Sequence, residues 1–262
     1  MPLTDRKYKA NQAILKDYGG KFFKLTAFKC LRTNGIEDET KRPPKGAVND
    51  EKLSENISRA RATVFELATC NNWTYWATFT LDSKKYDRTN LDKFRADFSQ
   101  FIRDQGKKHS CKIHYLLVPE LHKDGKSWHM HGFIEGLPAG ELRLFNLKEK
   151  IPKSLKEKLK KGDLVYDWTS YRNKFGFNDL ELVKNQEACS KYITKYLSKD
   201  ISKDIQTLGA HLYYNSKGLK RALEMKRGTI VSAMIPDYEN EYVRVQVFKQ
   251  PASLEDLKKM IL

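Results

Sequence analysis

The sequence has few cysteines and no long apolar run, and each scarcity excludes a class of protein. Its cysteines, Cys30, Cys70, Cys111 and Cys189, are scattered and form no CxxC pair, so we expect neither a disulfide framework nor a zinc finger. No apolar run approaches the length of a membrane span. The first residues, MPLTDRKYKANQ, lack the apolar region of a signal peptide. We therefore expect a cytoplasmic protein.

Acidic residues are scarce relative to basic ones. The chain of 262 residues has 49 Lys and Arg against 33 Asp and Glu, which gives a net charge of +16. Such a surplus repels itself unless a polyanion lies nearby. Nucleic acid is the commonest partner of this kind, and an anionic membrane face is the next. The alternative is that the lysines only keep the surface soluble.

Hydrophobic periodicity predicts both helices and strands. The length of the chain and its hydrophobic content of 40% allow one large domain with extensions. Helical spacing recurs over residues 49–70, 88–108, 186–201 and 253–262. The lysine-rich residues 146–163 predict a short surface helix or an insertion. Strand-like stretches lie at residues 19–32, 73–82, 111–121, 129–137, 179–185 and 241–248. The stretches at 111–121 and 129–137 are too close in sequence for a helical crossover, so we expect antiparallel pairing in an α+β fold.

Two of the six histidines flank a single residue. In the stretch KSWHMHGFIEGL, His129 and His131 would point to one face of a strand and Met130 to the other. Adjacent imidazoles can bind a cation, and Glu120 can supply an oxygen ligand if the two strands form a hairpin. His122, in the turn, is a rival ligand. The alternatives are a chance pair of partly exposed histidines and a solvated Glu120.

Two tyrosines lie four residues apart in the segment KYITKYLSK. On a helix, Tyr192 and Tyr196 would share one face, and each is followed three residues later by a lysine, Lys195 or Lys199. A tyrosine hydroxyl can attack a phosphodiester and hold the DNA covalently, while a lysine can stabilise the phenolate or bind phosphates. The alternative is an amphipathic helix with two half-buried tyrosines.

Three segments, in this order, resemble the HUH endonucleases, and among them the rolling-circle replication initiators of small phages and plasmids. ATFTLD at residues 77–82 is similar to the family's first motif, HMHG at residues 129–132 to the second, and YITKYLSK at residues 192–199 to the third. The resemblance extends over roughly residues 70–205. It departs from the family at Ser127 and Trp128, because many initiators have Arg-Pro or Lys-Pro just before the first histidine.

The resemblance implies a central antiparallel sheet with helices packed outside and the catalytic tyrosines on a helix. It implies Mg²⁺ or Mn²⁺ held by the two histidines and a third polar residue, for which Glu120 is our candidate. It implies cleavage of one strand at a replication origin, which leaves a free 3′-OH and a 5′-phosphotyrosine. In the two-tyrosine subgroup, Tyr196 would be the primary nucleophile and Tyr192 its alternate, assisted by Lys195 and Lys199.

We expect three parts in the chain: an N-terminal extension at residues 1–50, the endonuclease domain at 51–205, and a basic C-terminal extension at 206–262 that can complete the same domain. Single-stranded or supercoiled origin DNA is the expected partner. The candidate DNA contacts are Arg59, Arg61, Trp128, Lys220, Arg221 and Arg227, with a further lysine-rich run at residues 155–161. Alternatively, the basic residues lie on solvated faces and Trp128 packs instead of stacking on a base.

The sequence lacks an ATP-binding motif. GKS at residues 125–127 is not a P-loop, because the required earlier glycine would fall at Glu120. We therefore expect unwinding to come from a host helicase in a bacterial cytoplasm. Two other functions remain open. A single-strand transposase or a conjugative relaxase would use the same chemistry, although relaxases often place their tyrosines before the histidine motif. A non-catalytic DNA-binding protein would use the histidine pair structurally.

Overall fold

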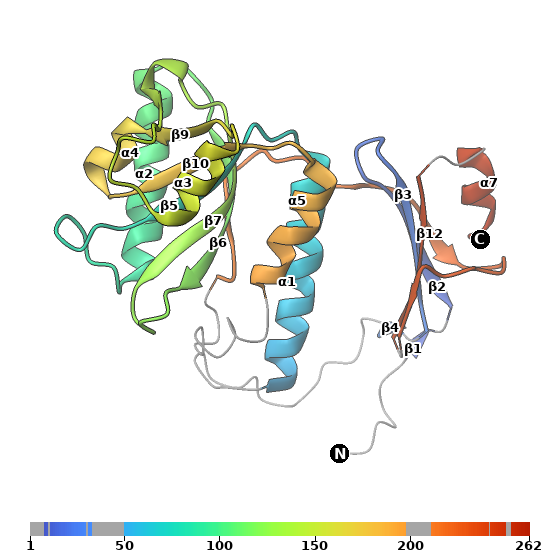
Figure 1. The fold of residues 1–262 in the computed structure, drawn as a ribbon. Coiled ribbons are helices and arrows are strands. Elements are labelled where there is room, and N and C mark those ends of the chain that lie inside the picture. The colour runs from blue at the N-terminus through green and yellow to red at the C-terminus, as the bar shows by residue number, and fades with distance from the viewer. Residues whose placement is uncertain are drawn as a thin grey trace. The chain divides into compact units, whose positions relative to one another are not determined.

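The protein is described from a computed structural model, shown in Figure 1. The described residues are 8–9, 11–29, 31–32, 50–197, 211–240, 242–249 and 253–262. The chain divides into two compact units, Lys45–Leu219 and the combination of Met1–Pro44 with Lys220–Leu262. Each unit has its own antiparallel sheet and its own hydrophobic core. The predicted α+β class is therefore confirmed.

The larger unit is built on a seven-stranded sheet in which every neighbouring pair is antiparallel. The strands lie in the order β11-β6-β7-β5-β10-β9-β8. Their bounds, in that order, are Tyr214–Asn215, His114–Leu121, Trp128–Glu135, Tyr75–Thr80, Asn178–Leu182, Val165–Trp168 and Leu142–Leu144. The hairpin that the short spacing predicts between 111–121 and 129–137 is the pair β6–β7.

Helices cover both faces of this sheet (Figure 1). Helix α2 (Leu91–Lys108) packs its phenylalanines on one face. Helices α1 (Asp50–Cys70) and α5 (Gln186–Ile193) lie side by side on the other face. Because alternate residues of a strand point to opposite faces, Met130 of β7 belongs to the α2 core and Phe133 to the α1 core. The histidines at 129 and 131 share the parity of Phe133 and lie on the α1 face.

The main helices form where the apolar spacing predicts them. In α1, Val64, Leu67 and Ala68 are fully or almost fully buried, three to four residues apart along one stripe. In α2, Phe94, Phe98 and Phe101 form the corresponding stripe. The side chain of Asn90 caps α2 by accepting a hydrogen bond from the Lys93 amide, 2.9 Å away. Burial of these stripes, more than helix propensity, holds the helices on the sheet.

The remaining elements of this unit are short. They are the 3₁₀ turn η2 (Ala139–Glu141), α3 (Lys153–Lys160), α4 (Thr169–Lys174) and the 3₁₀ turn η3 (Thr194–Tyr196). No helix in the described part of the chain is long and apolar enough to cross a membrane.

The smaller unit joins strands from both ends of the chain. Its five-stranded sheet has the order β12-β2-β3-β14-β13, and α7 (Leu254–Lys259) covers one face. The strand bounds, in that order, are Leu223–Thr229, Gln12–Asp17, Phe23–Phe28, Val243–Phe248 and Tyr238–Glu239. Strands β1 (Tyr8–Lys9) and β4 (Leu31–Arg32) form a separate two-stranded pair. Residues from the two expected extensions, 1–50 and 206–262, therefore share one core.

Several short elements, among them β2, β8, β9 and α4, have no counterpart in the sequence prediction. For two further differences, at the end of α5 and at β12, the structure shows a physical reason. The helix predicted over 186–201 ends at Ile193 and continues as the turn η3. The Thr194 hydroxyl donates to the Lys191 carbonyl, 2.7 Å away, and such a bond competes with the helical pattern. Strand β12, LEMKRGT, is poor in strand-forming residues, and its pairing with β2 overrides that local preference. The part of the predicted helix after Leu197 lies outside the described residues.

Candidate metal and nucleophile site

The histidine pair lies on the central strand β7. His129 and His131 are separated by Met130, which is buried in the opposite core, so both imidazoles lie on the α1 face. Their side chains are 12% and 14% exposed. The ring centres are 4.5 Å apart. The strand therefore holds two nitrogen donors side by side, as the sequence spacing predicts.

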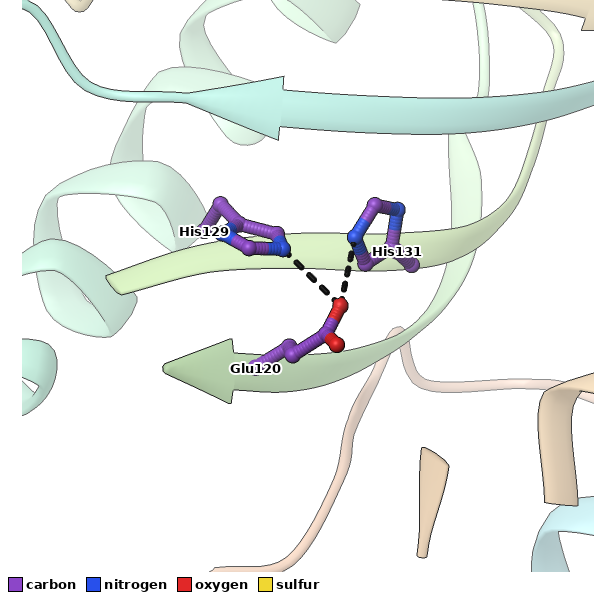
Figure 2. Close-up of side chains that lie close together, drawn as sticks. All are labelled: Glu120, His129 and His131. Carbon is purple, nitrogen blue, oxygen red and sulfur yellow. Dashed lines mark hydrogen bonds and ion pairs between the residues drawn. The ribbon is translucent and has the colours of Figure 1, made fainter. Parts of the chain in front are cut away.

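Glu120 lies directly opposite His129 on strand β6. The register of β6 and β7 continues without a shift through Pro119, so Glu120 keeps the parity of Leu116 and Val118, as expected from strand alternation. Its Oε2 is 2.9 Å from Nε2 of His129 and 2.9 Å from Nε2 of His131 (Figure 2). The three side chains thus converge on one point at the surface of the sheet.

The electrostatics of the cluster favour a charged Glu120 carboxylate beside a neutral His131 ring. Hydrogen bonds from the two imidazoles lower the pKa of Glu120 to about 2. Burial lowers the pKa of His131 below its ordinary value, against the opposing effect of Glu120. At neutral pH the cluster accordingly offers a carboxylate oxygen and an imidazole nitrogen in the protonation states that a metal ion requires.

The donor set fits a divalent cation. Ligands about 2.1 Å from one ion and at right angles to each other lie about 3.0 Å apart. Both carboxylate-to-imidazole distances, at 2.9 Å, are close to that separation, and all the candidate ligand atoms lie within 4.8 Å of one another. Carboxylate oxygen suits Mg²⁺ and Mn²⁺, and imidazole nitrogen suits divalent transition metals, so the mixed set is suited to a divalent metal ion. The residues Glu120, His129 and His131 can therefore hold a metal.

His122, the rival ligand, lies beside the cluster instead of in it. Its ring meets the ring of His129 edge-on, with centres 4.3 Å apart. Burial lowers the pKa of His122, and the positive potential of His129 and Arg88 adds to that effect. Among the described residues, the metal-ligand group contains Glu120, His129 and His131 without His122. An open pocket next to the triad is lined by Glu120, Leu121, His122, Lys123, Asp124 and His129.

The two tyrosines lie against the same cluster. The ring of Tyr196 stacks on the ring of His131, with centres 4.9 Å apart and planes inclined by 24°. The hydroxyl of Tyr196 donates to that of Tyr192 over 2.9 Å. Trp76 of β5 packs under both rings, at 5.4 Å from Tyr192 and 6.2 Å from Tyr196. The fold therefore brings both phenols to the edge of the candidate metal site, although the second one lies beyond the end of α5.

The two phenols differ in exposure. Tyr192 is 46% exposed, whereas Tyr196 is half-buried between His131 and Trp76. Burial raises the pKa of the Tyr196 hydroxyl above its ordinary value, and the bond to Tyr192 and the charge of Glu120 add to the rise.

A comparison with known families agrees with this arrangement. Residues 74–201 match the family model of the replication-associated protein ORF2/G2P. The match supports a rolling-circle Rep-type protein with a role in replication initiation. No curated protein and no solved structure is similar enough to the chain to count as a match. The matched segment contains Glu120, both histidines and both tyrosines.

Of the two lysines in the third motif, the structure describes only Lys195. Lys195 is exposed, and its Nζ lies 5.7 Å from the centre of the Tyr192 ring. Lys199 lies outside the described residues.

The predicted DNA contacts lie in several places. Trp128 and the lysine-rich run at residues 155–161, most of which belongs to α3, fall inside the matched segment, and the other predicted contacts fall outside it. Trp128 is partly buried against the α1 core, so it packs at least in part. Arg61, which is exposed on α1, donates from Nε to the carbonyl of Leu197 over 2.6 Å and so holds the end of the turn that carries Tyr196. Arg227 is paired with Glu224 at 2.7 Å. Arg59, Lys220 and Arg221 are exposed.

Three neighbours of the triad were not assigned a role from the sequence. They are Trp76 beneath the tyrosines, Thr78 beside His131, and Asp179 opposite Thr78 on β10. Trp76 and Thr78 are two residues apart on one strand, so strand alternation alone predicts that their side chains share a face. Nothing in the sequence relates Asp179 to His131, because the order β7-β5-β10 is a property of the sheet.

Proposed function

We propose that this protein is an HUH-type rolling-circle replication initiator of the two-tyrosine subgroup, which nicks and rejoins single-stranded origin DNA through a 5′-phosphotyrosine. The observation that carries the proposal is the contact of a phenol with the candidate metal site: Tyr196 stacks on His131, whose Nε2 lies 2.9 Å from Glu120. A tyrosine far from the triad could not act on a phosphate held there. The match of residues 74–201 to a replication-associated family supports the same function.

The chemistry follows from the roles of the side chains. The oxygen of Tyr196 attacks the scissile phosphorus, a new P–O bond forms to tyrosine, and the 3′-oxygen leaves and takes up a proton. A divalent cation held by Glu120, His129 and His131 would polarise the phosphate and stabilise its developing charge. The Tyr192 hydroxyl, 2.9 Å from that of Tyr196, is placed to attack in a second round and receive the strand at termination.

The surrounding residues bind and orient the DNA. Lys195, beside the Tyr192 ring, is exposed and can contact a phosphate of the bound strand. Lys199, by its place in the motif, would act similarly. We further propose that a separate helicase of a bacterial host unwinds the duplex, and that the protein acts in the cytoplasm of that host.

The test is covalent capture of DNA. Purified full-length protein is mixed with a pool of labelled single-stranded oligonucleotides, with Mn²⁺ or with EDTA, and run on a denaturing gel. We expect adducts with Mn²⁺ and none with EDTA. Tyr196→Phe should lose the adduct of the first cleavage, Tyr192→Phe should retain it, and the double variant should form none. Adduct formation by the double variant would exclude both tyrosines as nucleophiles.

A pair of histidine variants separates cleavage from binding. His129→Ala should abolish the adduct and leave the affinity for DNA within a few-fold, because phosphate contacts elsewhere supply most of that affinity. His114→Ala is the matched control: His114 also lies on the sheet, but its Nδ1 bonds to the Ser216 hydroxyl at 3.1 Å, outside the triad. Tight DNA binding without any adduct in the unmodified protein would favour a non-catalytic DNA-binding protein.

A further inference from the structure

A row of polar side chains crosses three strands behind the triad. In the register of the sheet, Thr78 of β5 lies directly opposite His131 of β7 on one side and opposite Asp179 of β10 on the other. The buried neighbours Ala77 and Leu180 belong to the α2 core, so Thr78 and Asp179 point to the same face as the histidines. Thr78 Oγ1 is 3.3 Å from Nδ1 of His131. Burial raises the pKa of the Asp179 carboxyl to about 6, and Thr78 beside it slightly opposes that rise.

From this row, and on the basis of the function proposed above, we propose that Thr78 and Asp179 are positioning residues that fix the orientation and tautomer of His131. The Nε2 of His131 faces Glu120, so this is the nitrogen that would bind a metal. A neutral imidazole that uses Nε2 as a ligand carries its proton on Nδ1. Thr78 Oγ1 accepts that Nδ1–H, and its own hydroxyl hydrogen then turns to Asp179.

The two histidines are not supported alike. Nδ1 of His129 is buried, and in the part of the chain that the structure describes it has no hydrogen-bond partner. Thr80 lies opposite His129 in the same strand as Thr78. Thr78 and Thr80 therefore lie on the same face of one strand, and each is opposite a candidate histidine ligand. Of these two threonines, only Thr78 contacts the Nδ1 of the histidine opposite it. This difference supplies a matched control within the protein.

The carboxylate at the end of the row is held in place. Asp179 is partly buried, and the charge of Lys158 on α3 attracts its carboxylate. Lys158 also bonds to Glu181, two residues along the same strand, at 2.7 Å. A partly buried carboxylate next to a cation accepts a hydroxyl hydrogen strongly, so Asp179 is suited to fix the direction of the Thr78 hydroxyl.

The experiment measures Mn²⁺ binding to the full-length protein by the electron paramagnetic resonance signal of free Mn²⁺. Thr78→Val removes the hydroxyl and keeps the shape, and it should weaken Mn²⁺ binding by about 10- to 100-fold, as losses of supporting hydrogen bonds to metal-bound histidine do. Thr80→Val should bind as the unmodified protein does. Thr78→Ser restores the hydroxyl and should restore the affinity to within about threefold.

The DNA adduct supplies the second measurement. In Thr78→Val, adduct formation should need correspondingly more Mn²⁺ and recover at saturating Mn²⁺, which a general loss of structure would not allow. If Thr78→Val does not fold, Asp179→Asn decides: Mn²⁺ binding at least about threefold weaker supports the proposal, and unchanged binding overturns it.

The outcomes separate this inference from the function on which it rests. If the unmodified protein binds no Mn²⁺ and forms no adduct, the proposed metal-dependent function fails, and the inference fails with it. If the unmodified protein binds Mn²⁺ and forms the adduct, but Thr78→Val binds Mn²⁺ as Thr80→Val does, only the inference is overturned.

Discussion

Gly132 lies immediately after the second histidine, where strand β7 passes closest to β6. Its φ of +153° is one that other residues rarely adopt. A Cβ at this position would lie 2.1 Å from the carbonyl oxygen of Leu116 and 3.0 Å from the Cα of Leu117, both backbone atoms of the neighbouring strand. The glycine therefore permits the strand approach that brings Glu120 to the histidines.

This close approach predicts a large effect of one methyl group. Gly132→Ala must separate β7 from β6 or distort both, and we expect the free energy of unfolding to fall by about 3 kcal/mol or more. The measurement is equilibrium unfolding in urea. Gly140→Ala is the control, because nothing lies within 4 Å of a Cβ built there, and it should change stability by less than about 0.5 kcal/mol. Equal stability of the two variants would contradict the argument.

At the scale of elements, Tyr196, the proposed nucleophile, is held by a turn as well as by a helix. Helix α5 begins at a capped end, where the Asn185 side chain accepts from the Ala188 amide at 2.9 Å, and it ends at Ile193. Tyr196 follows in η3, and Arg61 of α1 bonds to the carbonyl of Leu197 just after it. Helix α1 thus fixes the position of the turn that places Tyr196 on His131.

The Arg61 contact predicts a positioning defect. Arg61→Met removes the charged donor to Leu197, a bond of the kind that contributes about 1.5 to 3 kcal/mol, and the turn should lose its fixed position. We expect the rate of adduct formation at saturating DNA to fall about tenfold or more. Arg59→Met, on the same helix, removes the same charge and should leave that rate within about twofold. If both variants slow the reaction equally, Arg61 acts through its charge alone.

At the scale of the whole molecule, charge is the dominant property. The chain carries a net charge of +16, and both compact units have more Lys and Arg than Asp and Glu. A protein that binds single-stranded DNA by neutralising phosphates releases counterions, and the logarithm of its affinity falls by about 0.7 per phosphate contact for each tenfold rise in salt. The affinity of this protein for DNA should therefore depend steeply on ionic strength.

This charge predicts the result of a salt titration. Between 50 and 200 mM salt, we expect the Kd for a single-stranded oligonucleotide, measured by fluorescence anisotropy, to rise at least about tenfold. The double variant Lys220→Gln with Arg221→Gln should reduce the salt slope by up to about 1.4, if both residues contact phosphates. Lys258→Gln with Lys259→Gln removes the same charge from two lysines that are paired with Glu255 and Asp256, and it should leave the slope unchanged. Equal slopes in the two double variants would exclude Lys220 and Arg221 as contacts.

Local sequence determined the candidate ligands and the strand pair that carries them. The turn between β6 and β7 is too short for a crossover, so antiparallel pairing follows, and alternation then puts both histidines on one face. The position of Glu120 opposite the histidines could also be predicted, because the register of a hairpin is set by its short turn. The buried faces of α1 and α2 could also be predicted from the sequence, since each is a regular apolar pattern within one segment.

Only the tertiary structure decided which residues from distant parts of the sequence contact the histidine hairpin. Asp179 reaches the row behind His131 because β10 pairs with β5, and Tyr196 reaches His131 because α5 and η3 pack on the α1 face. The strands β2 and β12, from opposite ends of the chain, share one sheet although neither is marked as a strand by its own composition. The sequence by itself thus determined the chemistry of the histidine hairpin, because short-range geometry is set by alternation and turn length. The tertiary structure decided the contact of Tyr196 with His131 and the row formed by Thr78 and Asp179, because sheet order and helix packing depend on burial summed over the whole fold.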